Sequence, residues 1–166
     1  MEKFNRDIKR PILYTLIGLL IVFLDQFTKW LVLNKARGGF FVILRLLKAE
    51  IYRNKGIAFG FSIPYFILYV LVILVLVFCL LELRKGIIKK NFLVVLALVL
   101  VVCGAISNLV DRIRLGYVVD ILHFIPTGSM FNLADIAIVV GIGMLVWREI
   151  RKSKFIIHNS KACLQK

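Results

Sequence analysis

FLVVLALVLVVCGAISNL, the stretch from Phe92 to Leu109, contains no charged residue. At 1.5 Å per residue, a helix of this length extends about 27 Å, which is close to the hydrocarbon thickness of a bilayer. The stretch therefore predicts a membrane-spanning helix. Three further apolar stretches, at 12–33, 65–81 and 134–150, predict the same. We expect a single integral membrane domain, residues 1–166, with four transmembrane helices.

The composition of the whole chain agrees with a bilayer environment. Of the 166 residues 61% are hydrophobic and the mean hydropathy is +0.92, whereas soluble domains are nearer one half apolar. The three cysteines have neither the even count nor the spacing of a disulfide framework or a zinc site. The length excludes a large transporter and a membrane anchor with a separate soluble enzyme domain. We therefore expect neither redox chemistry nor metal binding by thiolates.

Basic residues predict the orientation of the chain in the membrane. Lys and Arg number 23 against nine Asp and Glu, which gives a net charge of +14. In so apolar a chain this surplus favours contact with membrane lipids, and we expect no nucleic acid as a partner. Most of the cations lie in the N-terminal tail, in the link between the second and third helices and in the C-terminal segment. Both termini are therefore predicted to face the cytoplasm. The first apolar stretch is predicted to be a retained helix and not a cleaved signal peptide.

Two longer loops are expected on the outer side. The loop 34–63 contains a strand-forming stretch at 40–52 between glycines, which predicts a short strand or hairpin at the membrane surface. The loop 113–131 has glycines and a proline around an apolar stretch, which predicts an amphipathic element or a lid. The predicted fold class is an all-α membrane protein with four transmembrane helices. It carries a small extracytoplasmic β-rich loop subdomain and a lid loop between the third and fourth helices.

Four acidic residues are predicted to lie at one depth near the outer leaflet. Asp25 is about 20 Å along the first helix, Asp111 ends the third and Asp135 begins the fourth. Asp120 lies in the loop between them. Ionisable groups in a membrane cost about 3 kcal/mol or more each and usually face a polar cavity. Further polar residues share these helix faces at spacings of three or four residues: Lys29, Asn108, Arg112 and Asn132.

The pattern of these residues leaves more than one function open. Asp25 with Lys29, and Asp111 with the arginine that follows it, suit ion pairs that merely join helices. Asp120 and Asp135 have no cation at helical spacing. Two such carboxylates close together share a proton, so that one activates water and the other polarises a carbonyl, as in aspartic proteases. A small transporter or channel subunit and a structural membrane adaptor are the alternatives.

Five blocks of the sequence carry a resemblance to a known family. They are Asp25-Gln-Phe-Thr-Lys29, Asn54-Lys-Gly56-Ile-Ala58-Phe59-Gly60, Ser107-Asn108-Leu-Val-Asp111-Arg112, Gly116-x-Val118-Val119-Asp120 and Phe131-Asn132-Leu-Ala134-Asp135. In order and spacing they resemble the blocks of bacterial lipoprotein signal peptidase, or signal peptidase II, over 25–141. Ser107 departs from the family pattern, which usually has Gly before the Asn.

The resemblance implies a membrane aspartic endopeptidase of the bacterial cytoplasmic membrane. Such an enzyme cleaves the signal peptide of prolipoproteins on the amino side of a lipobox cysteine that already carries diacylglycerol. The implied catalytic pair is Asp120 and Asp135. The implied substrate-binding or supporting residues are Asp25, Lys29, Asn54, Gly56, Asn108, Asp111, Arg112 and Asn132. The resemblance also implies that no cofactor is needed, because the nucleophile is water. We expect a monomer with its active site near the outer leaflet.

Overall fold

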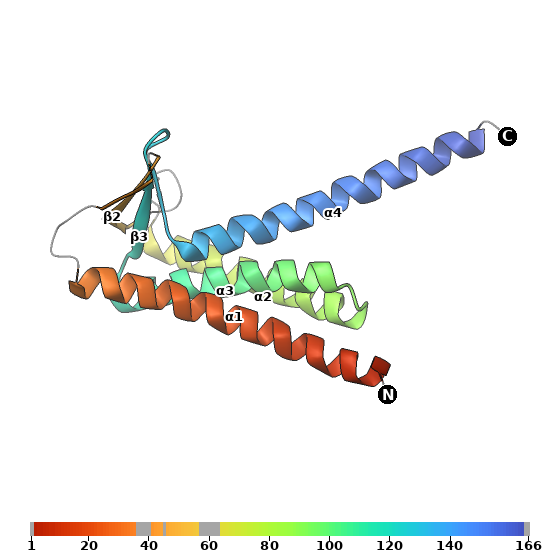
Figure 1. The fold of residues 1–166 in the computed structure, drawn as a ribbon, viewed down its shortest axis with the longest axis horizontal. Coiled ribbons are helices and arrows are strands. Elements are labelled where there is room, and N and C mark those ends of the chain that lie inside the picture. The colour runs from red at the N-terminus through yellow and green to blue at the C-terminus, as the bar shows by residue number, and fades with distance from the viewer. Residues whose placement is uncertain (1, 36–40, 45, 57–63, 165–166) are drawn as a thin grey trace.

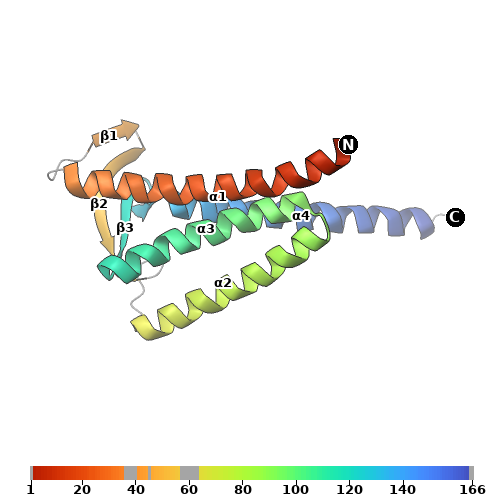
Figure 2. The ribbon, with the colours of Figure 1, turned by 90° about the horizontal axis from the view of Figure 1, so that it is seen from below.

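The computed structural model describes residues 2–35, 41–44, 46–56 and 64–164. The helices are α1 (Glu2–Lys35), α2 (Tyr65–Ile88), α3 (Phe92–Leu115) and α4 (Leu133–Leu164). The strands are β1 (Phe41–Leu44), β2 (Leu47–Asn54), β3 (Val118–Phe124) and β4 (Ser129–Phe131). The four helices run along a common direction, with the sheet at one end of the bundle and both termini at the other (Figures 1 and 2).

The helix α3 is the centre of the bundle and packs against α1, α2 and α4 (Figure 2). Its buried residues recur every three or four positions, which places them on the faces that the other helices cover. In contrast, α2 is apolar on all sides, and most of its large side chains are exposed. In a soluble protein that surface would be unfavourable, so it is the surface expected to face lipid tails.

Three helices of the described chain are long and apolar enough to cross a membrane: Arg10–Asn34 within α1, Phe66–Ile88 within α2, and α3 itself. The chain has four long helices, and the prediction that all four cross the membrane is supported by length and apolar character for these three. Crossing by α4 stays a prediction, because its uncharged stretch at 136–147 is bounded by Asp135 and by the charged pair that follows Trp147.

The helices are longer than hydropathy predicts. α1 begins at Glu2 rather than near residue 12, and α4 continues to Leu164 rather than ending near residue 150. α2 and α3 also extend past their predicted ends at 81 and 109. Hydropathy marks the part of a helix that suits hydrocarbon, whereas Lys, Arg and Glu at its ends continue the helix into the polar region.

The sheet is antiparallel with the order β1-β2-β3-β4. β1 and β2 form the predicted hairpin within 34–63. The structure corrects the prediction of a lid loop over 113–131, since β3 lies between β2 and β4 and Val118–Ile121 are buried. Only the turn at 125–128 remains a loop between the two strands. The sequence signal was weak because the strand that pairs with β3 lies far earlier in the chain.

Small residues bring α3 and α4 into close contact. A Cβ atom on Gly104 would lie 2.5 Å from the carbonyl oxygen of Ala134, and one on Gly141 would lie 2.5 Å from that of Ala97. Backbones approach this closely only where side chains are absent or minimal. α3 then ends at Gly116, whose φ of 79° is the left-handed conformation that suits glycine, and the chain turns into β3. The start of α4 and the start of β3 are thus both held beside the end of α3.

Candidate active site

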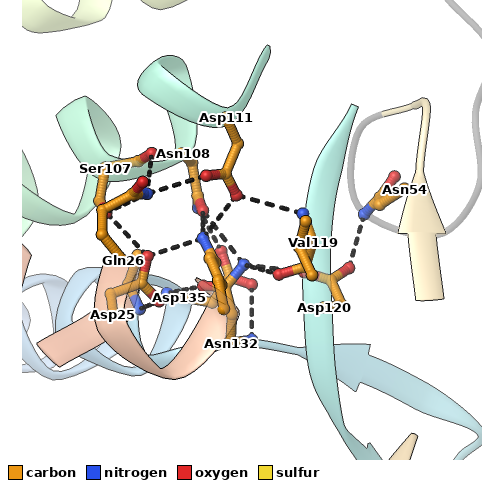
Figure 3. A network of polar contacts seen from close by, with 12 residues as sticks. Asp25, Gln26, Asn54, Ser107, Asn108, Asp111, Val119, Asp120, Asn132 and Asp135 are labelled. Carbon is orange, nitrogen blue, oxygen red and sulfur yellow. Dashed lines mark hydrogen bonds and ion pairs between the residues drawn. The ribbon is translucent and has the colours of Figure 1, made fainter. Parts of the chain in front are cut away.

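Polar side chains from α1, α3, α4, β2 and β3 meet where the sheet adjoins the helix bundle (Figure 3). Asp120 lies on β3 and Asp135 in the first turn of α4. Asp120 is only 1% exposed, and Asp135 is partly exposed. The two carboxylates that lacked cations at helical spacing in the sequence are therefore brought to one place by the fold.

Asp135 is fixed by the local structure of the α4 N-terminus. The Asn132 Oδ1 accepts a 2.9 Å hydrogen bond from the Asp135 amide, and the Asn132 amide donates at 3.2 Å to Asp135 Oδ2. This reciprocal arrangement is a capping box, which an Asn followed three residues later by an acid can form. The other carboxylate oxygen, Oδ1, accepts a 2.8 Å bond from the Asn108 side chain. Both oxygens of Asp135 thus accept hydrogen bonds, which stabilises the carboxylate.

Asp120 is held by two amide side chains. Its Oδ1 accepts a 2.8 Å bond from Asn132 Nδ2, and its Oδ2 accepts a 3.0 Å bond from Asn54 Nδ2. Burial raises the pKa of Asp120 to about 6, and the negative charge of Asp135 adds to the increase. The two hydrogen bonds act in the opposite direction, because they favour the ionised form. Asp120 therefore keeps its proton to a higher pH than an exposed aspartic acid does.

Asn132 connects the two carboxyl groups. Its side chain donates to Asp120 while its backbone amide donates to Asp135. The same side chain donates to Asn108 Oδ1 at 3.1 Å, and Asn108 in turn donates to Asp135. Asn132 is fully buried, so these contacts have no competing water. In the described residues neither Asp120 nor Asp135 is part of an ion pair.

A buried ion cluster lies directly behind this pair. The Lys29 Nζ is 2.6 Å from Asp25 Oδ2 and 2.8 Å from Asp111 Oδ2, and it donates at 3.0 Å to Asn108 Oδ1. The three charged side chains are each no more than 3% exposed. A lone buried charge would be very unfavourable, so one ammonium shared by two carboxylates needs the further hydrogen bonds that surround it.

Each carboxylate of this cluster also holds the backbone that carries one member of the pair. Asp25 Oδ1 accepts a 2.9 Å bond from the amide of Ala134, the residue before Asp135. Asp111 Oδ2 accepts a 3.1 Å bond from the amide of Val119, the residue before Asp120. Helix N-terminal amides lack intrahelical partners and favour negative charge, so Asp25 is well placed at the start of α4. The ion cluster therefore positions both carboxyl groups.

Gly56 and Arg112 border the site on the sheet side. The Gly56 amide donates at 3.1 Å to Asn54 Oδ1, and the Gly56 carbonyl accepts at 3.3 Å from Arg112 Nη2. The carbonyl of Arg112 accepts a bond from the Tyr69 hydroxyl. The rest of the second sequence block, Ile57 to Gly60, lies outside the described residues. Asn54 is thus held on one side by Gly56 while its amide points to the buried carboxyl group (Figure 3).

A family model described as signal peptidase (SPase) II matches residues 17–151 of the chain. The chain belongs to the signal peptidase II family. The matched segment includes every predicted site residue, from Asp25 to Asp135. Family membership also makes the chain a membrane aspartic peptidase, and it does not support the transporter alternative.

Similar curated proteins are named lipoprotein signal peptidase. The protein from Halalkalibacterium halodurans is 34% identical over 147 residues, which covers 86% of this chain and 94% of that protein. The one from Caldanaerobacter subterraneus subsp. tengcongensis is 37% identical over 131 residues, covering 75% and 87%. The one from Bartonella tribocorum is 37% identical over 152 residues, covering 87% and 90%. The signal peptidase II similarity therefore extends over most of each chain.

Solved structures agree with this assignment at the level of the fold. A bacterial membrane enzyme solved by the in meso method at 2.3 Å resolution superposes with a TM-score of 0.72 at 25% identity. The superposition covers 84% of this chain and 88% of that one. A second such enzyme, at 1.9 Å, gives a TM-score of 0.69 at 26% identity and covers 81% and 90%.

The signal peptidase II site differs from the sequence interpretation in three respects. Asp111 pairs with Lys29 and not with the neighbouring Arg112, because the side chains meet between helices. Gln26 also belongs to the network, since its Nε2 donates at 2.8 Å to Asp111 Oδ1. Ser107, which departs from the family pattern, is buried and donates a 2.7 Å bond to Asp25 Oδ2. For Gln26 and Ser107, the signal available in the sequence was a polar side chain at the depth of Asp25.

Metal ligands are not grouped in the described part of this signal peptidase II. No three His, Cys, Asp or Glu side chains there are arranged to hold an ion. The polar atoms beside the two carboxyl groups belong to asparagines, which donate hydrogen bonds to them. Independence from metals and cofactors stays a prediction.

Proposed function

We propose that Asp120 and Asp135 are the catalytic dyad with which this signal peptidase II removes signal peptides from prolipoproteins. The substrate is proposed to carry diacylglycerol on its lipobox cysteine, and the bond cleaved precedes that cysteine. One observation carries the assignment of the dyad. The two carboxyl groups share Asn132 as a hydrogen-bond donor, and neither is neutralised by a cation within the described residues.

The two carboxyl groups have different roles in the proposed reaction. Asp135 is proposed to be ionised and to accept a proton from the attacking water, because it lies in the first turn of α4, where the helix N-terminus favours a negative charge. Asp120 is protonated and donates to the scissile carbonyl oxygen, because its pKa is raised to about 6. Water adds to the carbonyl carbon and gives a gem-diol. As the C–N bond breaks, the proton on Asp135 passes to the leaving nitrogen and one gem-diol hydroxyl returns its proton to Asp120. The resulting carboxylic acid then loses its proton to water. The products are the signal peptide carboxylate and the free amine of the lipidated cysteine.

The position of the dyad suits a substrate that is itself a membrane helix. Peptide groups near the scissile bond must leave the helix before cleavage, and in lipid they then need new hydrogen-bond partners. Asn54 and Arg112 lie at the border of the site with polar side chains that can supply them. Diacylglycerol chains on the substrate would remain in the bilayer beside the helices.

The proposed orientation places both termini in the cytoplasm and the dyad near the outer leaflet of the bacterial cytoplasmic membrane. The termini lie at the end of the bundle opposite the sheet (Figures 1 and 2). In the topology predicted from the sequence, most Lys and Arg residues lie on the same side of the membrane as the termini. α4 is the proposed fourth crossing, through its uncharged stretch at 136–147. The enzyme is proposed to act as a monomer, because one chain supplies both carboxyl groups.

Cleavage of a purified, diacylglyceryl-modified prolipoprotein tests the dyad. Asp120→Asn and Asp135→Asn should each lower kcat/KM by roughly 10³-fold or more, since residues that act as a unit fail together. Glu50→Gln is the matched control, because Glu50 lies on the same sheet but pairs with His123 at the surface. Mass spectrometry of the product should place the new N-terminus at the modified cysteine. Undiminished cleavage by either Asn variant with an intact fold would refute the assignment.

A further inference from the structure

A groove of about 650 Å³ lies between α1, α3 and the end of α2, away from the dyad. Its lining is mostly aliphatic, and its floor lies where Gly18 of α1 meets Cys103 of α3. It extends along α1 from Arg10 to Val22, which is about 18 Å at 1.5 Å per residue. That length exceeds half of a hydrocarbon core about 30 Å thick. The groove therefore runs from one membrane surface to slightly beyond the bilayer centre.

Two cations lie at the surface end of this groove. Arg10 begins the apolar part of α1, and Lys90 follows the last residues of α2. The Arg10 guanidinium is 3.7 Å from the centre of the Phe92 ring, and Phe92 is the first residue of α3. Arg10 is therefore held beside the turn that carries Lys90. The groove thus combines a positively charged entrance with an apolar interior.

The lining of the groove matches the two parts of an anionic lipid. Basic side chains lie at one end of the groove, and aliphatic side chains line the rest. A single acyl chain is narrow enough to enter. Leaving apolar walls without partner atoms would lose dispersion contacts, so lipid is expected to fill the space.

We propose that the groove binds one anionic phospholipid, with its phosphate at Arg10 and Lys90 and one acyl chain along the apolar lining. Anionic headgroups are attracted by basic residues near the membrane surface. The site is distinct from the dyad, which lies at the sheet end of the bundle. Its assignment to the cytoplasmic leaflet depends on the proposed orientation, whereas binding itself does not.

Native mass spectrometry of the delipidated protein tests the charged end of the site. Phosphatidylglycerol should bind in preference to phosphatidylcholine with the same acyl chains. Arg10→Gln with Lys90→Gln should weaken phosphatidylglycerol binding by roughly tenfold or more and leave phosphatidylcholine unchanged. Arg84→Gln with Lys89→Gln removes two cations near the same end that do not line the groove, and should have little effect. Equal binding of the two lipids, or equal loss in both double variants, would overturn the proposal.

A second pair of variants tests the apolar part. Thr15 lines the groove and is exposed, so Thr15→Phe should place a ring where the acyl chain lies and weaken binding of both lipids. Leu16→Phe adds a ring at an exposed position outside the groove and should leave binding intact. Unchanged lipid binding by Thr15→Phe would contradict the placement of the chain. Cleavage by all of these variants is measured in parallel, so that failure of the lipid site is separable from failure of the proposed proteolysis.

Discussion

Asp120 and Asp135 differ in the backbone that carries them and in the donors around them. Asp135 belongs to a capping box at the start of a helix, whereas Asp120 lies on a buried strand and accepts only from amide side chains. Burial is the largest influence on the pKa of Asp120, and it raises that pKa. The different roles proposed for the two side chains therefore rest on their different local structures.

The pH dependence of cleavage should report Asp120. As the proposed acid it is active when protonated, so kcat/KM should fall as pH rises through about 6. The hydrogen bond from Asn54 lowers this pKa, so Asn54→Ala should raise it and move the falling limb to higher pH. Asn34→Ala removes an exposed amide on α1 and should leave the limb in place. A limb that moves to lower pH in Asn54→Ala would contradict the assignment of the proton.

Lys29 should contribute far more to stability than an exposed lysine with the same ion-pair distance. Lys29 and Lys85 each lie 2.6 Å from a carboxylate, but the Lys29 side chain is 3% exposed and that of Lys85 is 62% exposed. Lys29→Met leaves Asp25 and Asp111 as buried charges without their cation, which costs roughly 3–5 kcal/mol. Lys85→Met should cost at most about 1 kcal/mol. Thermal unfolding in detergent measures both, and similar losses would refute the buried cluster.

At the scale of elements, α3 and α4 contact one another directly beside Asp135 of the proposed dyad. Ala134 is at once the residue whose carbonyl contacts Gly104 and the residue whose amide is held by Asp25. Any displacement of α4 at this point moves Asp135, the next residue in the chain. The glycine is therefore required by the site as well as by packing.

Gly104→Ala should impair cleavage more than a neighbouring glycine variant does. The added Cβ would lie 2.5 Å from the Ala134 carbonyl oxygen, so α4 must shift. A displacement of about 1 Å at catalytic groups can lower rates by roughly 10²-fold. Gly143→Ala adds a methyl group with no atom within 4 Å and should retain activity. Equal kcat/KM values for the two variants, measured on the same substrate, would show that this contact does not position the dyad.

At the scale of the whole molecule, the sheet and the termini lie at opposite ends of the bundle (Figure 1). If α4 crosses the membrane, the turn between β3 and β4 lies on one side of the membrane. The C-terminal part of α4 then lies on the other side. The distance along α4 is sufficient, since 32 residues extend about 48 Å against a hydrocarbon core of about 30 Å.

Labelling of single cysteines by an impermeant maleimide tests this topology. The background removes the native thiols by Cys79→Ala, Cys103→Ala and Cys163→Ala. Thr127→Cys, in the turn between β3 and β4, should react in intact spheroplasts, whereas Lys154→Cys on α4 should react only after permeabilisation. Lys89→Cys, at the end of α2, is the control and should behave as Lys154→Cys does. Labelling of Thr127→Cys and Lys154→Cys from the same side would show that α4 does not cross.

The sequence by itself determined the positions of the helices and nominated the candidate site residues. Apolar stretches such as Phe92 to Leu109 have to avoid water, which needs no knowledge of their neighbours. Asp120 and Asp135 were recognisable because carboxyl groups without nearby cations are unfavourable in an apolar chain. The hairpin within 34–63 followed from local strand propensity between glycines.

Only the tertiary structure decided how these residues are held. The strand β3 forms because β2 supplies its hydrogen bonds from a distant part of the chain, so local sequence predicted a loop. Asp111 pairs with Lys29 of another helix, and Asp25 holds the Ala134 amide at the start of α4. Such contacts depend on the close packing of helices that α3 and its glycine permit. Residue type and spacing are local properties of the chain, whereas the partners of a buried charge are set by the distances that folding creates.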